Sequence, residues 1–349
     1  MKMKLLYIIV LISASANAQL TDVVTGINNP FGLAASGNDL YVSESGSSKI
    51  VKIDLTAVTP IATDVYAPTG NYITGIALNG NELYYADEVS NKVYKIDITI
   101  PNPVATEVIA GLGGVVGIAF KDDDLYIVEK NSHKISKIDL TVANPVKTDV
   151  ITGLSTPYSI AFYGDIMYIA EFGADKISKV DVSDAIPTRT DVVSFLSRPI
   201  GLVVRGNELY ISDYLANRIL KINLTQANPT IAFVVSNTTR PIGIVFSNND
   251  LYIAEEADDK ISRFSSPALS LNDELYVKSI RMYPSPATSV LNIEMTQNLK
   301  KVTIYNLLGK EVLQTNSKTI DVSNLSQGMY VLKITSVEGT QTTKRFIKQ

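Results

Sequence analysis

Six pairs of an acidic and a basic residue, repeated at regular intervals, are the residues of this chain best suited to chemistry. The acids are Glu44, Asp87, Glu129, Glu171, Asp213 and Glu255. The base follows five residues later in each copy, as Lys49, Lys92, Lys134, Lys176, Arg218 and Lys260. Carboxylates gathered at one end of a repeat structure could bind a divalent metal. Because every copy carries the pair in the same place, we interpret it as a repeated structural contact between the second and third strands of each unit.

The chain contains few other residues that could form a catalytic or metal-binding site. The chain has one histidine, His133, and no cysteine. The other copies carry Ser48, Asn91, Asp175, Asn217 and Asp259 in place of His133, which is typical of a turn. Thiolate sites, disulfides and a lipidated cysteine are excluded. The acidic stretches at 121–124 and 255–259 lack the spacing of a calcium-binding EF-hand loop. We therefore predict no metal, no cofactor and no catalytic residue.

The elements that carry these pairs form a repeat of 42 or 43 residues. Each unit holds a tyrosine three residues before the acid: Tyr41, Tyr84, Tyr126, Tyr168, Tyr210 and Tyr252. One unit contains strand-like segments at 117–120, 125–129, 134–139 and 148–151, separated by Gly, Asn, Asp or Pro. Four strands in a unit of this length indicate a propeller blade, which must stack on its neighbours to bury its faces. Six units predict an all-β, six-bladed propeller over residues 19–264.

The two ends of the repeat array predict that it closes into a ring. The last copy stops near Phe264, after its third strand. The segment Thr21–Pro30 matches Thr148–Pro157, which contains the fourth strand of another unit, almost position for position. We therefore expect the N-terminal strand to complete the sixth blade and cover its edge.

The repeat resembles the NHL repeat. The segment Leu40-Tyr-Val-Ser-Glu44-Ser-Gly-Ser-Ser-Lys49-Ile has the acid, polar loop and base of that family, and Asp213 to Arg218, with Asn217 before the base, is closer still. The resemblance covers about residues 20–264 and implies a six-bladed propeller of the NHL and YWTD type. It leaves the function open.

Positions at which the copies differ are the candidates for binding. Just before the innermost strand, at one mouth of the channel, the copies carry Asn29, Tyr72, Gly114, Thr156, Arg198 and Arg240. Directly after the repeated acid they carry Ser45, Glu88, Lys130, Phe172, Tyr214 and Glu256. Two arginines beside two aromatic residues suit a carboxylate, sulfate or phosphate group. We predict a ligand site at Arg198, Arg240, Phe172, Tyr214, Tyr72 and Asn29; the alternative is a polar rim without a ligand.

Three functions remain open on this scaffold. The first is binding of an anionic small molecule, a glycan or a surface protein. The second is a metal-dependent hydrolase similar to the gluconolactonase propellers, which needs carboxylates converging on the channel. The innermost strands, such as 31–34 and 74–77, contain no carboxylate. The third is a scaffold role, which the sequence does not separate from binding. We favour binding over catalysis.

Both ends of the chain indicate export. Residues 1–18 have the basic start, the apolar run Leu5–Ile12 and the Ala16-Asn17-Ala18 ending of a cleaved signal peptide. The apolar run is too short for a membrane anchor, and no transmembrane segment is predicted. The formal net charge is −4, and the basic residues are scattered, so nucleic acid is excluded as a partner.

A second domain follows a linker predicted at 265–276. Residues 277–349 have the short alternating strands of a small immunoglobulin-like β-sandwich. Their motifs are Tyr283-Pro284-Ser285-Pro286-Ala287, the turn at Gly309, Gly328-Met-Tyr330, and a last strand with Lys344 and Lys348. Together these resemble the type A C-terminal sorting domain of the Bacteroidetes type IX secretion system, with Ser285 in place of asparagine. The resemblance implies recognition by the type IX machinery, passage across the outer membrane, removal of the domain, and release or attachment at the cell surface.

Overall fold

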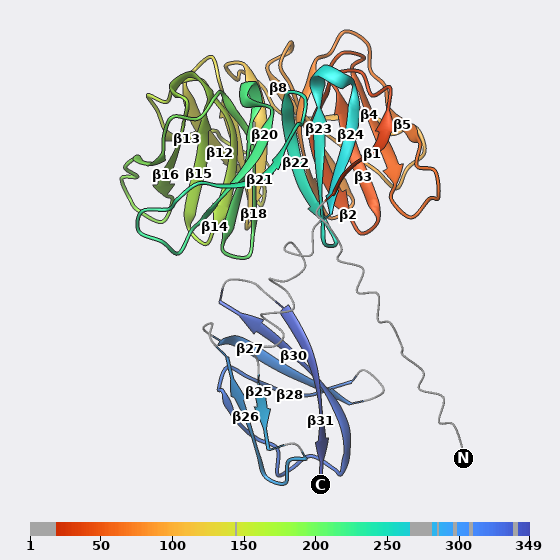
Figure 1. The fold of residues 1–349 in the computed structure, drawn as a ribbon, viewed down its shortest axis with the longest axis vertical. Coiled ribbons are helices and arrows are strands. Elements are labelled where there is room, and N and C mark those ends of the chain that lie inside the picture. Colours follow the sequence, from red (N-terminus) through yellow and green to blue (C-terminus); the bar gives the residue numbers. More distant parts are fainter. Residues whose placement is uncertain are drawn as a thin grey trace, which may run out of the picture.

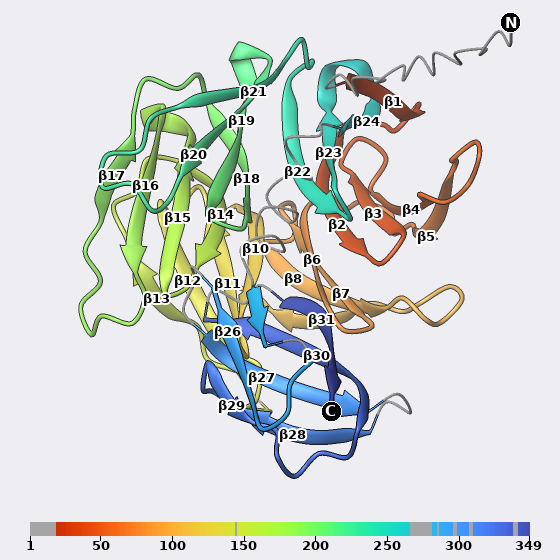
Figure 2. The same ribbon diagram turned by 60° about the horizontal axis from the view of Figure 1, so that its bottom comes forward.

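The computed structural model describes residues 19–143, 145–265, 281–284, 286–295, 299–306, 310–337 and 341–349. Residues 19–265 form six four-stranded antiparallel sheets arranged around one axis, as Figure 1 and Figure 2 show. We call each sheet a blade, and the prediction of a six-bladed propeller is confirmed. No helix in the described parts of the chain is long and apolar enough to cross a membrane.

The strands of each blade follow the chain outward from the axis. The innermost strands are β2 (Pro30–Ser36), β6 (Ile73–Asn79), β10 (Val115–Lys121), β14 (Pro157–Tyr163), β18 (Pro199–Arg205) and β22 (Pro241–Ser247). The second strands are β3 (Asp39–Glu44), β7 (Glu82–Asp87), β11 (Asp124–Glu129), β15 (Ile166–Glu171), β19 (Glu208–Asp213) and β23 (Asp250–Glu255). The third strands are β4 (Lys49–Asp54), β8 (Lys92–Asp97), β12 (Lys134–Asp139), β16 (Lys176–Asp181), β20 (Arg218–Asn223) and β24 (Lys260–Ser265). The outermost strands of the first five blades are β5 (Ala62–Tyr66), β9 (Thr106–Ile109), β13 (Thr148–Ile151), β17 (Thr190–Val193) and β21 (Ala232–Ser236).

The second strand of every blade is the most deeply buried element. In β11, Leu125, Ile127 and Val128 are fully buried and Tyr126 is 3% exposed. Residues that alternate along a strand point to opposite faces of the sheet. Both faces of β11 therefore contact neighbouring blades, which explains why apolar residues are continuous in this strand and why one blade is not stable alone.

The N-terminal strand β1 (Gln19–Thr25) completes the sixth blade, as the permuted sequence predicts. It pairs antiparallel with β24, with Leu20 opposite Phe264. Beyond the strand, the Ile27 N–H donates to the Asp259 carbonyl at 2.8 Å. The ring is thus closed by hydrogen bonds between the two ends of the repeat array.

Glycines on the innermost strands set the width of the channel. A β-carbon at Gly201 would lie 2.1 Å from the Ile242 carbonyl oxygen of the next blade, and one at Gly243 would lie 2.2 Å from the Phe31 oxygen. Gly32 and Gly75 have the same contact at 2.7 Å. Neighbouring innermost strands therefore approach too closely for a side chain at these positions.

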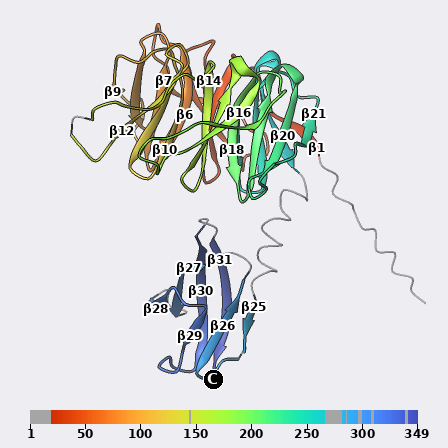
Figure 3. The ribbon, with the colours of Figure 1, turned by 90° about the vertical axis from the view of Figure 1, so that its left-hand side faces the viewer.

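The C-terminal region forms a separate β domain of two sheets, seen in Figure 1 and, from the side, in Figure 3. One sheet contains β25 (Arg281–Tyr283), β26 (Val290–Glu294) and β29 (Thr319–Asp321). The other has the order β28 (Glu311–Thr315), β27 (Leu299–Asn306), β30 (Gly328–Ser336) and β31 (Gln341–Lys348). The two sheets share a core that includes Leu291, Val302, Leu332 and Phe346. This is the β-sandwich expected from the sequence.

The channel glycines make a direct test of the ring geometry. We expect Gly201→Ala to destabilise the protein by roughly 1–3 kcal/mol, because the methyl group overpacks the contact with Ile242. Ser159→Ala is the control, since the fourth blade already carries a β-carbon at this position. Urea unfolding of both variants measures the difference. Equal stability of the two variants would contradict the close approach of β18 and β22.

Candidate functional site

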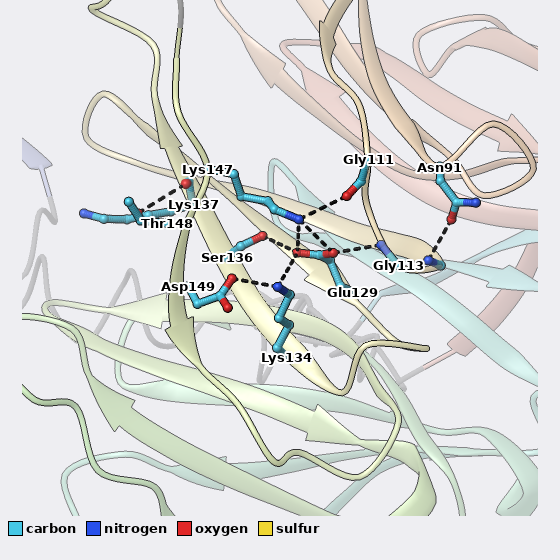
Figure 4. Close-up of polar contacts among 11 residues, drawn as sticks. Asn91, Gly111, Gly113, Glu129, Lys134, Ser136, Lys137, Lys147, Thr148 and Asp149 are labelled. Atoms are coloured by element: carbon cyan, nitrogen blue, oxygen red, sulfur yellow. Dashed lines mark hydrogen bonds and ion pairs between the residues drawn. The ribbon is translucent and has the colours of Figure 1, made fainter.

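The repeated acids are buried at the ends of the second strands. Figure 4 shows Glu129, which is 1% exposed. Its carboxylate accepts the Gly113 N–H at 2.8 Å and the Ser136 hydroxyl at 2.6 Å. Lys147 Nζ lies 3.2 Å from the same carboxylate, and Lys134 Nζ lies 3.9 Å from it. Glu129 therefore stabilises, through the Gly113 N–H, the loop that leads into β10, the innermost strand of its own blade.

The same contact recurs in other blades. Further pairs of loop N–H donor and buried acid are Tyr72 with Asp87 (3.0 Å), Ser155 with Glu171 (2.8 Å), Ser197 with Asp213 (2.5 Å) and Thr239 with Glu255 (2.6 Å). In the first blade, Glu44 instead accepts the Ser47 hydroxyl. These hydrogen bonds offset part of the cost of burying each charge, although one carboxylate oxygen each of Glu171 and Glu255 accepts no hydrogen bond from the described residues. The acids thus have the structural role expected from their repetition.

Most of the repeated bases, in contrast, do not form the expected ion pair with the acid of their own hairpin. Acid and base face each other across the hairpin, but most bases bind an acid of the outermost strand instead. These ion pairs are Lys49–Asp64 (2.9 Å), Lys92–Glu107 (2.7 Å), Lys134–Asp149 (2.8 Å), Lys176–Asp191 (2.7 Å) and Lys260–Asp22 (3.0 Å). Hydrogen bonding to Asp149 raises the pKa of Lys134. Only Arg218 lies within 3 Å of the acid of its own hairpin, Asp213, at 2.7 Å. In that blade Phe233 replaces the outer acid, and Arg218 lies over its ring.

The turn positions occupied by His133 and its counterparts join each blade to the next. His133 Nδ1 accepts the Thr156 N–H at 3.2 Å. The equivalent bonds run from Gly114 to Asn91, Arg198 to Asp175, Arg240 to Asn217 and Asn29 to Asp259, at 2.8–2.9 Å. His133 therefore lies where the other blades have an ordinary turn acceptor.

The two variable positions of each blade are adjacent at the same mouth of the ring. The Tyr214 N–H donates to the Arg198 carbonyl at 3.4 Å, and the Glu256 N–H donates to the Arg240 carbonyl at 3.2 Å. In the third blade the Lys130 N–H donates to the Gly114 carbonyl at 3.0 Å. This backbone contact places all the variable side chains around one opening, which we call the mouth.

At the mouth, Arg198 lies over the ring of Phe172. Its guanidinium carbon is 4.7 Å from the ring centroid, a distance typical of a cation–π contact. Arg198 is partly exposed, and the described residues place no carboxylate within ion-pair distance of it. Arg198 therefore places a positive charge against an aromatic ring at the mouth, without a carboxylate beside it in the described residues.

Arg240 is arranged differently. Its guanidinium carbon is 5.9 Å from the Tyr214 ring centroid, and its Nη1 is 4.0 Å from a Glu256 oxygen. The Tyr214 hydroxyl donates to Glu256 at 2.5 Å. Burial and this hydrogen bond raise the pKa of Tyr214 to about 12. Glu256 thus offsets part of the charge of Arg240, whereas Arg198 has no such carboxylate neighbour in the described residues.

The aromatic residues form a connected row. The Phe172 ring lies 4.7 Å from Tyr158 and 6.5 Å from Tyr214. Lys130 Nζ is 5.5 Å from the Tyr158 ring and pairs with Glu88 at 2.6 Å. Tyr158 was not among the residues predicted from the sequence. It could have been found because it is an aromatic residue at the second position of an innermost strand, where among the six blades only the first blade also has one, Phe31.

Two of the predicted site residues lie outside this cluster. The Asn29 N–H donates to Asp259 at 2.8 Å, and its carbonyl accepts the Ser45 hydroxyl at 2.9 Å. Tyr72 is 38% exposed, and its N–H bonds to Asp87. Within the part of the chain that the structure describes, neither has a ring contact, ion pair or hydrogen bond with Arg198 or Phe172. The structure therefore brings together Arg198, Phe172, Tyr214 and Arg240.

A cavity of about 380 Å³ runs along the channel between the innermost strands. Its lining includes Phe31, Leu33, Ile76, Val116 and Ile200, and no carboxylate. Tyr158 belongs both to this lining and to the aromatic row, so it connects the channel with the mouth. The hydrolase alternative needs acids that converge on the channel, whereas five of the six repeated acids of the second strands are bound to backbone N–H groups of the entry loops.

In the C-terminal domain, the Tyr-Pro-Ser-Pro-Ala motif adjoins the end of the last strand. Tyr283 is 51% exposed, and the Tyr283–Pro284 peptide is cis. Beyond Pro286, the Ala287 N–H donates to the Ile347 carbonyl at 2.8 Å. Ser285 and the predicted turn at Gly309 lie outside the described residues.

The other predicted motif residues lie on the larger sheet. Gly328 begins β30, and Tyr330 is buried with its ring 5.5 Å from Phe346 and its hydroxyl donating to the Ser326 carbonyl at 2.9 Å. Lys344 is partly exposed on β31, whereas Lys348 is 8% exposed and donates to the Gln349 carbonyl. Of these motif residues, Tyr330 packs in the core of the sandwich and Lys348 is buried near the end of its last strand.

Comparison with known proteins identifies this second domain. Residues 281–349 match the family model described as a secretion system C-terminal sorting domain. The chain is also 35% identical over 72 residues to Beta-agarase D of Zobellia galactanivorans. That match covers 20% of this chain and 15% of the agarase, so the chain spans a small part of its relative. The sorting domain directs secretion by the type IX system, and the protein is therefore exported to the extracellular space or the cell surface.

Solved structures similar to the chain are β-propellers. A catalytically inactive virginiamycin B lyase from Staphylococcus aureus aligns with a TM-score of 0.55 and 16% identity, over 72% of this chain and 99% of that one. A luciferin-regenerating enzyme aligns with a TM-score of 0.61 and 11% identity, over 72% and 96%. A chain from a nidogen/laminin complex aligns with a TM-score of 0.55 and 17% identity, over 66% and 86%. At these identities the likeness shows the fold alone.

The structural role of the repeated acids is tested by removing one of them. We expect Asp213→Ala to destabilise the protein by roughly 3–5 kcal/mol, because Arg218 and the Ser197 N–H lose a buried acceptor. Asp191→Ala is the control, since its ion pair with Lys176 is exposed and worth about 0–1 kcal/mol. Denaturant unfolding measures both. A small effect of Asp213→Ala would argue against the structural role.

Proposed function

We propose that this protein is an exported binding propeller whose mouth, over the fourth to sixth blades, holds an anionic group against Arg198 and Phe172. The observation that supports this most is the Arg198 guanidinium, 4.7 Å from the Phe172 ring centroid and without an acidic partner in the described residues. A guanidinium of this kind can form two parallel hydrogen bonds to a carboxylate, sulfate or phosphate. The aromatic surface beside it favours a ligand with a flat or apolar group next to the anion.

Arg240 has a secondary role in this proposal. Its carboxylate neighbour Glu256 reduces its attraction for an anion, but Glu256 also fixes Tyr214 through the tyrosine hydroxyl. Tyr214 then continues the aromatic surface of Phe172 toward the sixth blade. Asn29 and Tyr72, on the same face, are proposed only as outer contacts of a larger ligand.

Several finer assignments accompany this proposal. We propose that residues 1–18, which lie outside the described residues, are a cleaved signal peptide. We propose further that residues 19–264 are a propeller of the NHL or YWTD type, joined by a linker at 265–276 to the sorting domain at 277–349. The buried acid and the base five residues later in each blade support the NHL assignment. The similar solved structures include enzymes and a protein complex, so the fold alone does not choose between catalysis and binding.

Aromatic anions provide a direct test of the mouth. At low ionic strength, we expect benzoate, phenyl sulfate or phenyl phosphate to raise the melting temperature, because a ligand of the folded state stabilises it. The neutral compound benzyl alcohol is the chemical control. Arg198→Ala should remove the shift and Arg240→Ala should reduce it. If none of the three anions shifts the wild-type protein, or if Arg198→Ala responds as wild type does, the proposal is wrong.

Export is tested separately in the producing cell. A chain that ends at residue 276 should accumulate inside the outer membrane, because it lacks the sorting domain, whereas the complete chain should reach the medium or the surface. Immunoblots of the periplasmic, membrane and medium fractions measure this distribution. Equal release of both chains would show that another segment directs export.

A further inference from the structure

The loop that leads into the innermost strand of the fifth blade contains an unusual aromatic residue. Phe195 has a φ of +63° and is 97% exposed. The equivalent positions of four other blades also have positive φ, but they are occupied by glycine or asparagine: Gly26, Gly111, Gly153 and Asn237. Among these equivalent positions with positive φ, Phe195 is the one with a large side chain.

Neither folding nor packing accounts for a phenylalanine here. The left-handed region is free of strain for glycine, is tolerated by asparagine, and is unfavourable for a bulky residue. An almost fully exposed ring buries no apolar surface that would offset this cost. The loop is held instead by the next residue, Leu196, which is buried and whose N–H donates to the Asp175 carbonyl at 2.9 Å. A strained residue without a packing role indicates a function.

Two further residues lie close to Phe195 along the backbone, one in the turn that is hydrogen-bonded to its loop and one in the loop itself. Leu215, in the adjacent turn, is 53% exposed, and its N–H donates to the Ser197 carbonyl at 3.0 Å. Arg198 lies three residues after Phe195, and its guanidinium is the one placed over Phe172. We call Phe195, Leu215 and Arg198 the blade-5 patch. It combines exposed apolar side chains with an arginine that lacks an acidic partner in the described residues.

We propose that the blade-5 patch docks an extended polypeptide segment of a partner protein, in which a carboxylate side chain lies near an apolar one. This inference rests on the anion contact proposed for Arg198. Phenylalanine and leucine have no hydrogen-bonding groups for the hydroxyls of a sugar, and a small free anion would not need them. Phenylalanine, like other aromatic residues, and arginine are enriched in the cores of protein interfaces.

The geometry agrees with a peptide strand. Phe195 and Arg198 are separated by three residues, so their α-carbons are at most about 10 Å apart. Side chains at positions i and i+2 of an extended strand lie on one face, about 7 Å apart. An acid followed two residues later by Leu, Phe or Tyr would therefore present both side chains to Arg198 and Phe195.

The first experiment asks whether Phe195 is retained at a cost to folding. We expect Phe195→Gly to raise the melting temperature by about 2 °C or more, and the reciprocal change Gly153→Phe, in the fourth blade, to lower it. A lower melting temperature for Phe195→Gly would show that the ring serves the fold, and would overturn the proposal.

The second experiment measures docking with a phage-displayed library of random peptides panned on the complete chain. We expect enriched peptides with Asp or Glu two residues from an apolar residue. A synthetic copy of one such peptide should bind Phe195→Gly at least about tenfold more weakly. The control Phe233→Ala removes an exposed phenylalanine from β21 and should leave binding unchanged. Enrichment without acids, or equal binding to Phe195→Gly, would overturn the proposal.

The two proposals at this mouth can fail separately. If aromatic anions still depend on Arg198 while no peptide depends on Phe195, the anion site stands and peptide docking is wrong. If Arg198→Ala changes neither response, both proposals are wrong.

Discussion

The structure depends above all on the close approach of neighbouring innermost strands around the axis. Each blade exposes two apolar faces and is stable only between two others, so the six blades must close into a ring. Glycines such as Gly201 and Gly243 permit this approach, because a β-carbon there would collide with a carbonyl oxygen of the next blade. The pairing of β1 with β24 then joins the two ends of the array. Closure fixes the radius of the ring, and with it the distances between side chains at the mouth.

Hydrogen bonds from the repeated polar residues hold the loops at the mouth in fixed positions on the ring. Each of five buried acids binds a backbone N–H of the loop that enters its own innermost strand, and the turn acceptors bind the loop of the next blade. Every loop at the mouth is therefore held from two blades, and a side chain carried by it is placed on a rigid base. This arrangement explains how six nearly identical units can present a specific surface, since only the residues at the loop tips need to differ.

Much of this architecture could be predicted from the sequence because its signals are local. Short apolar or alternating segments separated by the turn residues Gly, Asp and Pro predicted the strands of the blades. The permuted segment Thr21–Pro30 predicted the closure of the ring. The partners of the repeated bases could not be predicted in the same way. Lys134 is nearest in sequence to Glu129, but Asp149 on the outermost strand is exposed beside it and costs less desolvation. Which of two acids a flexible lysine reaches is a question of three-dimensional distance and not of spacing.

The arrangement of the candidate site could likewise be predicted only in part from the sequence. The sequence predicted two arginines beside two aromatic residues, and in the structure the guanidinium carbons of Arg198 and Arg240 lie 4.7 and 5.9 Å from the ring centroids of Phe172 and Tyr214. It could not show that Glu256 lies close to Arg240, which makes the two arginines unequal. Phe195 could not be selected from the sequence, because its unusual feature is its backbone conformation. The positive φ that it shares with Gly26, Gly111 and Gly153 shows that a phenylalanine is the exception at this position. In a repeat protein, a residue that departs from its copies and is also unfavourable for the local conformation points more directly to function than one that merely varies.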